Sequence, residues 1–145
     1  MNKHCRNFVN ILNRTDQNSH SLLNGKNILV ADDNKLNIKI LLFILNKAGA
    51  TTHIAETGKQ ALDLIQSTPI DAILMDVHMP EMDGLEATQF IRLQLKSNVP
   101  IIGLTATTLE SEMGKCIDMG MNRCISKPFD PPKLLEMISE LIDGN

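Results

Sequence analysis

The sequence predicts a single α/β domain in which five parallel strands form a doubly wound sheet with helices on both faces. From residue 26 onward, short aliphatic runs alternate with longer segments whose apolar residues recur at helical spacing. The short runs are apolar almost throughout, as is typical of parallel strands that are covered on both faces. Glycine and proline also fall at the expected ends of these segments. A length of 145 residues fits one such domain and leaves no room for a second.

The expected elements follow one another as five pairs of a strand and a helix. The strands are the short, mostly aliphatic runs, expected at 28–31, 52–55, 72–75, 101–104 and 123–125. The helices are the longer amphipathic segments after them, expected at 34–48, 58–66, 84–95, 107–119 and 131–142. Gly49 and Gly120 end the first and fourth helices, whereas Pro100 and Pro131 begin the fourth strand and the fifth helix. Residues 1–25 are rich in Asn, Ser, His and Gln, and we expect a tail or linker there, with the domain over 26–143.

Composition and charge exclude several classes of function. A net charge of −3 provides no basic surface for nucleic acid, and the absence of Trp and Tyr leaves no aromatic platform for stacking bases. No apolar run is long enough to span a membrane, so we expect no membrane contact from this segment. The three cysteines, Cys5, Cys116 and Cys124, lack the spacing of a zinc site or a disulfide framework, which fits a reducing, cytoplasmic location.

Polar side chains follow four of the predicted strands. Right-handed crossovers bring the carboxyl ends of all strands to one edge of the sheet, where ligands bind in open α/β folds. Asp32 and Asp33 follow the first strand, and the third, fourth and fifth strands lead to Asp76, Thr105 and Lys127. Taken singly, such residues are more often caps, turn residues or solvated charges. Together, carboxylates that favour Mg²⁺, a hydroxyl and a fixed cation predict phosphoryl transfer onto a carboxylate.

Four segments carry a family resemblance. They are ILVADDN (28–34), MDVHMPEMDG (75–84), PIIGLTA (100–106) and SKPF (126–129). With these motifs in order, residues 26–143 resemble the receiver domain of two-component signalling proteins, as in chemotaxis regulators. The second segment, which is followed by LEAT, is most similar to receivers of hybrid sensor histidine kinases. The resemblance implies the flavodoxin-like (βα)₅ receiver fold with strand order 2-1-3-4-5.

The resemblance also implies a role for each site residue. Asp76 would accept a phosphoryl group from a phosphohistidine in a Mg²⁺-dependent reaction, and the acyl phosphate would hydrolyse slowly. Mg²⁺ would be held by the carboxylates of Asp32, Asp33 and Asp76 and by the backbone carbonyl of His78. Thr105 would hydrogen-bond the phosphoryl group and Lys127 would pair with it. Such a protein modifies itself and is not a conventional turnover enzyme.

Three positions need separate comment. The side chain of His78 would, by the resemblance, point toward the mouth of the site and tune the attack of water, which we favour over metal ligation. Cys124 occupies the position, three before Lys127, at which receivers often carry an aromatic switch residue. Since the chain has no Tyr, the usual coupling of that residue to the Thr cannot operate. Ala31 replaces the usual Val, which is a small packing change.

The first predicted helix is unusually apolar and suggests a partner surface. If Leu36, Ile40, Leu41, Ile44 and Leu45 face the core, then Ile38 and Leu42 face outward. These two residues are then either tolerated on the surface or part of a docking face, next to Lys127, for a histidine kinase or a histidine phosphotransfer protein. The sequence leaves both interpretations open.

Other functions fit the residues less well. A haloacid-dehalogenase-like phosphatase also uses an Asp nucleophile and Mg²⁺, but it needs a second Asp two positions later, where this chain has His78. A flavodoxin-like cofactor carrier needs a hydroxyl-rich loop and aromatic residues that are missing, and no nucleotide-binding glycine motif is present. A receiver that only scaffolds partners conflicts with the intact set of site residues. We expect no output domain after the fifth helix, which leaves a single-domain response regulator or the C-terminal receiver of a hybrid histidine kinase.

Overall fold

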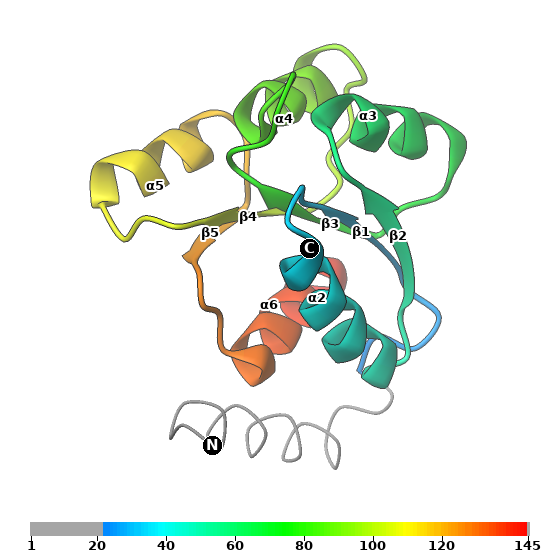
Figure 1. The fold of residues 1–145 in the computed structure, drawn as a ribbon. Helices are drawn as coiled ribbons and strands as arrows, with labels where there is room; N and C mark the ends of the chain where they lie inside the picture. Colours follow the sequence, from blue (N-terminus) through cyan, green and yellow to red (C-terminus); the bar gives the residue numbers. More distant parts are fainter. Residues whose placement is uncertain (1–21, 145) are drawn as a thin grey trace.

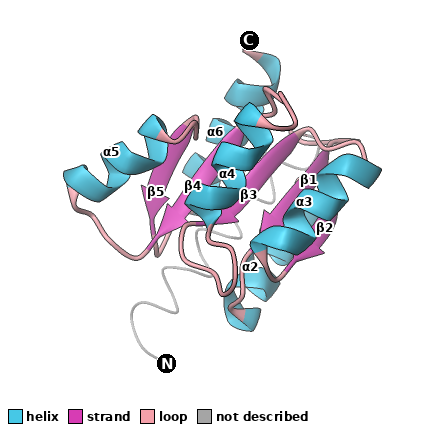
Figure 2. Cartoon of the chain, turned by 90° about the horizontal axis from the view of Figure 1, so that it is seen from above, coloured by secondary structure: helices cyan, strands magenta, loops and turns pink. Residues whose placement is uncertain are grey.

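Five parallel strands form one sheet in the order β2-β1-β3-β4-β5 in the computed structural model, which describes residues 22–144 (Figure 2). The strands are β1 (Asn27–Ala31), β2 (Thr51–Ala55), β3 (Ala72–Asp76), β4 (Ile101–Thr105) and β5 (Arg123–Ser126). The predicted fold class and strand order are therefore confirmed. The central strands β1, β3 and β4 are almost fully buried, whereas β2 and β5 lie at the two edges and are only partly covered.

Helices cover both faces of the sheet (Figure 1). One face carries α2 (Lys35–Lys47) and α6 (Pro131–Asp143), and the other carries α3 (Gly58–Ser67), α4 (Gly84–Leu93) and α5 (Glu110–Asp118). A separate hydrophobic cluster lies on each side of the sheet. Within the described residues, no helix combines the length and the apolar character that crossing a bilayer requires.

The main difference from the predicted boundaries lies before α5. We expected this helix to begin at residue 107, but it begins at Glu110. The hydroxyl of Thr105 accepts a hydrogen bond from the amide of Thr107, and the hydroxyl of Thr107 accepts one from the amide of Leu109. These local bonds from side chain to backbone favour turns over a helix and hold this stretch as a loop.

The orientation predicted for the first helix is right for Leu41, Ile44 and Leu45, which are buried, and wrong at two other positions. Ile38, which we expected to face outward, is buried with 7% of its surface exposed, and Leu42 is half-buried. Leu36, which we expected in the core, is 65% exposed. Because nearly every position between Leu36 and Leu45 is apolar, the pattern does not fix the rotation of the helix about its axis. Packing selects the face formed by Ile38, Leu41, Ile44 and Leu45.

The described chain begins with a turn that belongs to the packed domain. Leu23 was expected to lie in the tail, yet it is buried in the cluster beneath α2 and α6, and its amide donates to the carbonyl of Ala48 at 3.0 Å. Gly25 takes a positive φ of 75° and leads into β1. Residues 1–21 of the predicted tail lie outside the described part of the chain.

Candidate functional site

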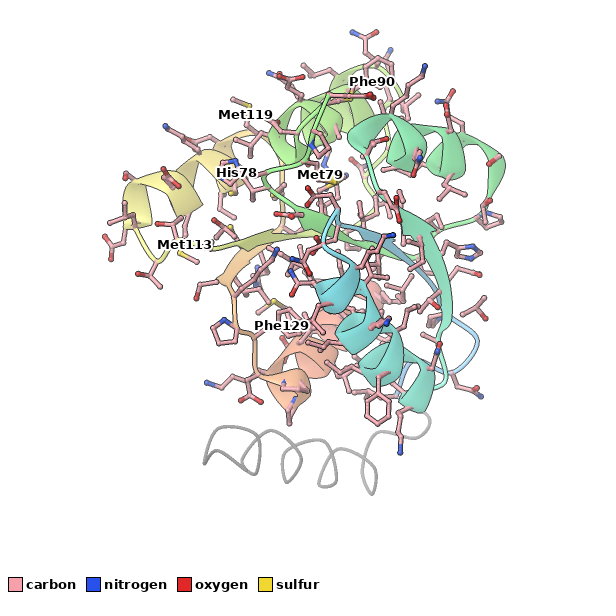
Figure 3. All side chains as sticks on the ribbon, in the orientation of Figure 1. His78, Met79, Phe90, Met113, Met119 and Phe129 are labelled. Atoms are coloured by element: carbon pink, nitrogen blue, oxygen red, sulfur yellow. The ribbon has the colours of Figure 1, made fainter. Side chains whose placement is uncertain are left out.

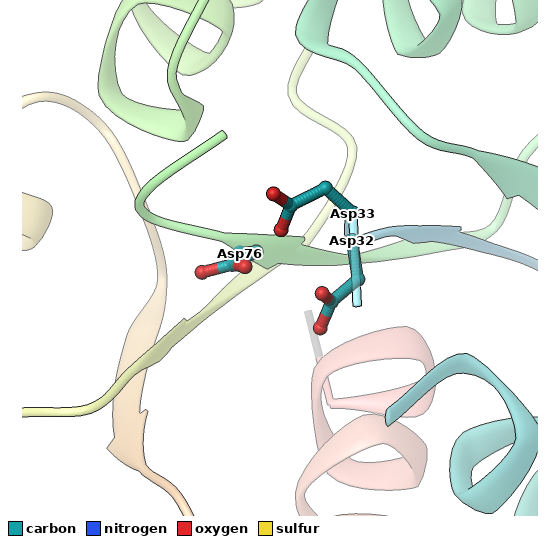
Figure 4. Close-up of side chains that lie close together, drawn as sticks. All are labelled: Asp32, Asp33 and Asp76. Carbon is teal, nitrogen blue, oxygen red and sulfur yellow. The ribbon is translucent and has the colours of Figure 1, made fainter. Parts of the chain in front are cut away.

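Three carboxylates meet at the carboxyl edge of the sheet. Asp32 and Asp33 follow β1, and Asp76 is the last residue of β3, which pairs with β1. One carboxylate oxygen from each lies within 4.8 Å of the others (Figure 4). Asp32 is fully buried and Asp76 is 6% exposed, whereas Asp33 faces solvent. The structure thus brings together the three acids that the sequence placed at this edge.

One ammonium group partly compensates these charges. The Nζ atom of Lys127 lies 3.4 Å from Oδ2 of Asp32 and 3.4 Å from Oδ2 of Asp76. The amide of Lys127 donates to the carbonyl of Thr105 at 2.7 Å, which fixes the loop after β5 against β4. The peptide bond between Lys127 and Pro128 is cis. With all groups ionised, three carboxylates and one ammonium leave a net charge of −2, which matches a divalent cation.

The electrostatics of Asp76 follow from its burial. The pKa of Asp76 is raised from 3.8 to about 6, chiefly by the loss of solvent and also by the nearby charge of Asp32. Lys127 and the amide of His78 oppose this shift. A further positive charge nearby would lower this pKa and favour the carboxylate form.

Backbone amides hold the two buried carboxylates in fixed orientations. Oδ1 of Asp32 accepts from the amide of Asn34 at 2.8 Å, and Oδ1 of Asp76 accepts from the amide of His78 at 3.2 Å. In each case Oδ2 is the atom that approaches Lys127. Sequence analysis missed the role of the Asn34 amide, since it weighed side chains and not the turn that follows Asp32.

The glycine that closes the motif around Asp76 has a steric role. A Cβ atom on Gly84 would collide with the carbonyl oxygen of Asp76 and would come within 2.9 Å of the side chain of Met75. The amide of Gly84 donates to the carbonyl of Val77 at 2.9 Å, and Asp83 caps the helix by accepting from the amide of Glu86. The start of α4 is therefore pressed against the end of β3, which fixes the backbone of the candidate acceptor.

Thr105 and His78 lie beside this cluster. Thr105 ends β4 and is 2% exposed, and the preceding Leu104 is in register with Asp76 on β3. His78 is exposed on the loop between β3 and α4 (Figure 3). Both residues line a cavity of about 90 Å³. Its remaining wall comes from Val77, Leu85, Glu112, Lys115 and Cys116.

A second feature escaped the sequence analysis. Cys124 was noted only as a substitute for an aromatic residue, but its Sγ atom lies 3.1 Å from Sγ of Cys116. The eight-residue separation of the two cysteines matches no metal or redox motif. Only the packing reveals this contact, because Cys116 lies on the inward face of α5 and this helix packs directly on β5, the strand of Cys124.

Comparisons with known proteins agree with this geometry. The response regulator receiver domain family matches residues 28–139. The chain is 40% identical over 144 residues to probable histidine kinase 6 of Oryza sativa subsp. japonica, covering 86% of this chain but only 15% of that protein. It therefore spans a small fraction of the length of this relative.

Solved structures show the same likeness. One is the receiver domain of the sensor histidine kinase PA1611 from Pseudomonas aeruginosa PAO1, solved with a magnesium ion in its active-site cleft, with 34% identity, a TM-score of 0.76 and coverage of 83% of this chain and 99% of that chain. Another is the receiver domain of the Saccharomyces cerevisiae response regulator Ssk1 in complex with the histidine phosphotransfer protein Ypd1. It is 28% identical, with a TM-score of 0.76 and coverage of 82% of this chain and 90% of that chain.

Proposed function

This chain belongs to the response regulator receiver domain family, and from that premise we propose that Asp76 is its phosphoryl acceptor. Receivers of this family act in two-component signal transduction, and the related proteins include hybrid histidine kinases. The observation that carries the assignment is the position of Asp76, a carboxylate at the end of β3 between two further acids and Lys127. Asp32, the other buried carboxylate of the described residues, has no exposed surface at which a donor could reach it, whereas Asp76 keeps 6%.

The chemistry assigned to Asp76 is an in-line displacement. A carboxylate oxygen of Asp76 forms a bond to the phosphorus of a phosphohistidine, and the bond between phosphorus and the imidazole nitrogen breaks, with its electron pair leaving on the imidazole. The product is an acyl phosphate on Asp76. Lys127 pairs with the new negative charge from its position beside Oδ2, and the hydroxyl of Thr105 donates to a phosphoryl oxygen.

The acidic cluster fits Mg²⁺. Its support is the convergence of three carboxylates beside one lysine, because carboxylates this close repel one another unless a cation or a proton offsets part of their charge. The residues that would hold the ion are Asp32, Asp33 and Asp76, together with the backbone carbonyl of His78. When bound, the ion supplies positive charge that neutralises the transferred phosphoryl oxygens.

The protein partner is a histidine phosphotransfer protein or a histidine kinase. The complex of Ypd1 with the Ssk1 receiver supports this kind of partner. For the docking face we propose the exposed apolar side chains of α2, Leu36 and Phe43, together with the half-buried Leu42 and the surroundings of Lys127. Leu36 is three residues from Asp33, so a helix of the partner lying there would bring its histidine to the acidic cluster. Ile38 is no longer part of this proposal, since it is buried.

The proposal also covers the kind of protein in which this receiver domain occurs. The 40% identity to a rice histidine kinase and the match to the sensor kinase RcsC of Escherichia coli support a receiver attached to a hybrid histidine kinase, with a single-domain regulator as the second candidate. A cytoplasmic location is supported by the proposed phosphohistidine donor and by the two cysteines, which are free in the structure.

The deciding experiment is intact-mass spectrometry after incubation with Mg²⁺ and acetyl phosphate. We expect one phosphoryl adduct on the parent chain and none on Asp76→Asn, while Asp63→Asn, a change at an exposed carboxylate on α3, retains the adduct. An adduct on Asp76→Asn, or none on the parent, would refute the acceptor. Sustained hydrolysis of an added phosphate ester would favour a phosphatase instead.

A further inference from the structure

Two thiols lie in contact on the side of the sheet that carries α5. Cys116 is in α5 and is 2% exposed, and Cys124 is in β5 and is partly buried. Their Sγ atoms are 3.1 Å apart, with the thiol of Cys124 donating to Cys116 and that of Cys116 donating to the carbonyl of Glu112 at 3.5 Å. Both are free cysteines in the structure. A disulfide would shorten the sulfur separation by about 1 Å, because the bond length is about 2.05 Å.

The thiol of Cys124 packs beside a glycine on the neighbouring strand. Cys124 is in register with Gly103 on β4, and a Cβ atom on Gly103 would lie 3.4 Å from Sγ of Cys124 and 2.5 Å from Sδ of Met121. The missing side chain at Gly103 therefore leaves a space that Sδ of Met121 fills, with Sγ of Cys124 at its border. Cys116 also lines the small cavity shared by Thr105 and His78, so the pair lies next to the site.

We propose that Cys116 and Cys124 form a reversible disulfide when the protein meets a peroxide, and that this bond ties α5 to β5 beside Thr105. In the first step one thiol attacks the peroxide, its sulfur gains oxygen to become a sulfenic acid, and water leaves when the peroxide is hydrogen peroxide. In the second step the other sulfur attacks the sulfenic sulfur, the sulfur–sulfur bond forms, and a second water carries away the oxygen and the remaining thiol hydrogen. Two thiols and one peroxide thus give one disulfide and two waters.

The close contact favours the second step, whereas burial slows the first. Burial and the hydrogen bond to Cys116 raise the pKa of Cys124 to about 12, and the thiolate is the reactive form of cysteine. The first step therefore depends on local opening of α5. Two features of this helix favour such opening: its N-cap makes no side-chain hydrogen bond, and its interior contains Gly114, which lowers helix propensity.

The bond has a consequence for α5 that can be measured. A covalent link between α5 and β5 opposes the local opening that lets helix amides exchange with solvent. We expect amide exchange in α5 to slow by at least about threefold in the oxidised protein, with exchange in α3 unchanged. The α3 helix is the matched reference because it packs on the same face of the sheet and contains no cysteine.

The test uses the 145-residue chain with Cys5→Ser, so that only the two thiols of the pair remain. After hydrogen peroxide treatment, intact mass should fall by two hydrogen atoms, and dithiothreitol should restore it. Cys116→Ala and Cys124→Ala in the same background should show no such loss and should gain oxygen instead, and thermal unfolding checks that each is folded.

If the folded Cys5→Ser protein keeps two alkylatable thiols after the treatment, the disulfide is refuted. If the disulfide forms but α5 exchanges as before, the tether is refuted. Neither readout depends on Asp76, so failure here is separate from failure of the phosphoryl acceptor.

Discussion

The buried carboxylate of Asp76 should destabilise the metal-free domain at neutral pH, and Asp76→Asn should relieve this. The pKa of Asp76 is raised from 3.8 to about 6, chiefly by burial, so the native state holds the proton more tightly than the unfolded chain. Stability therefore falls as pH rises from 3.8 to about 6 and stays at the lower level above that window. A shift of about two pKa units corresponds to about 3 kcal/mol, which is an upper value for the gain on neutralisation. Asn also gives up the attraction to Lys127, and its neutral Oδ1 accepts a weaker bond from the His78 amide, so we expect a gain of about 1–3 kcal/mol.

Urea unfolding of both proteins in EDTA measures this difference. At about pH 7.5 the midpoint for Asp76→Asn should lie above that of the parent, and the gap should close toward about pH 4 as the parent carboxyl becomes protonated. Adding Mg²⁺ should stabilise the parent more than the variant, because the ion binds the native acidic cluster. Asp63→Asn is the control and should show neither trend, since this carboxylate is exposed. A gap that does not change with pH, or a variant less stable than the parent at neutral pH, would contradict the electrostatic account.

Three further substitutions test the packing, the mouth of the site and the partner surface. Gly84→Ala should lower the free energy of unfolding by about 2 kcal/mol or more, because its Cβ meets the backbone of Asp76. Gly114→Ala, a change in open space within α5, should raise the free energy of unfolding by about 0.5–1 kcal/mol. Equal effects of the two substitutions in urea titrations would argue against the steric role of Gly84. His78→Ala should leave adduct formation on Asp76 intact and shorten the lifetime of the adduct several-fold by admitting water, and an unchanged decay followed by mass spectrometry would remove this role from the side chain. Leu36→Glu places a charge in the apolar docking face, so it should slow phosphotransfer from a histidine phosphotransfer protein by about tenfold and leave phosphorylation by acetyl phosphate unchanged. An equal loss with both donors would count against docking on this face.

The elements of the fold were predictable because each carries a local signal. The strands are short aliphatic runs, and glycine at positive φ ends two of the helices at Gly49 and Gly120, as the sequence suggested. The meeting of Asp32, Asp33 and Asp76 was also predictable, because parallel strands bring their carboxyl ends to one edge. The rotation of α2 about its axis was not predictable, since the sequence of a helix that is apolar nearly all round does not show which face is buried. Only the packing of the whole domain decides which residues it buries.

The contact between Cys116 and Cys124 was unpredictable for a related reason. It arises from the packing of α5 on β5, beside a glycine on the neighbouring strand. Neither depends on the spacing of the cysteines in sequence.

The loss of an aromatic switch residue changes where a signal from Thr105 can go. Cys124 is too short to swing between two positions as an aromatic ring would, and the chain contains no Tyr to replace it. The side chains that share the cavity with Thr105 come instead from the β3–α4 loop, from the start of α4 and from α5, and they include His78, Leu85 and Cys116. A rearrangement of Thr105 toward a phosphoryl group would therefore reach α5, whose N-cap makes no side-chain hydrogen bond, through this cavity. The proposed disulfide would tie down this same helix. The oxidation state of the thiol pair and the phosphorylation state of Asp76 would then both act on α5. Oxidation should therefore alter the response of α5 to phosphorylation, and phosphorylation should alter its response to oxidation.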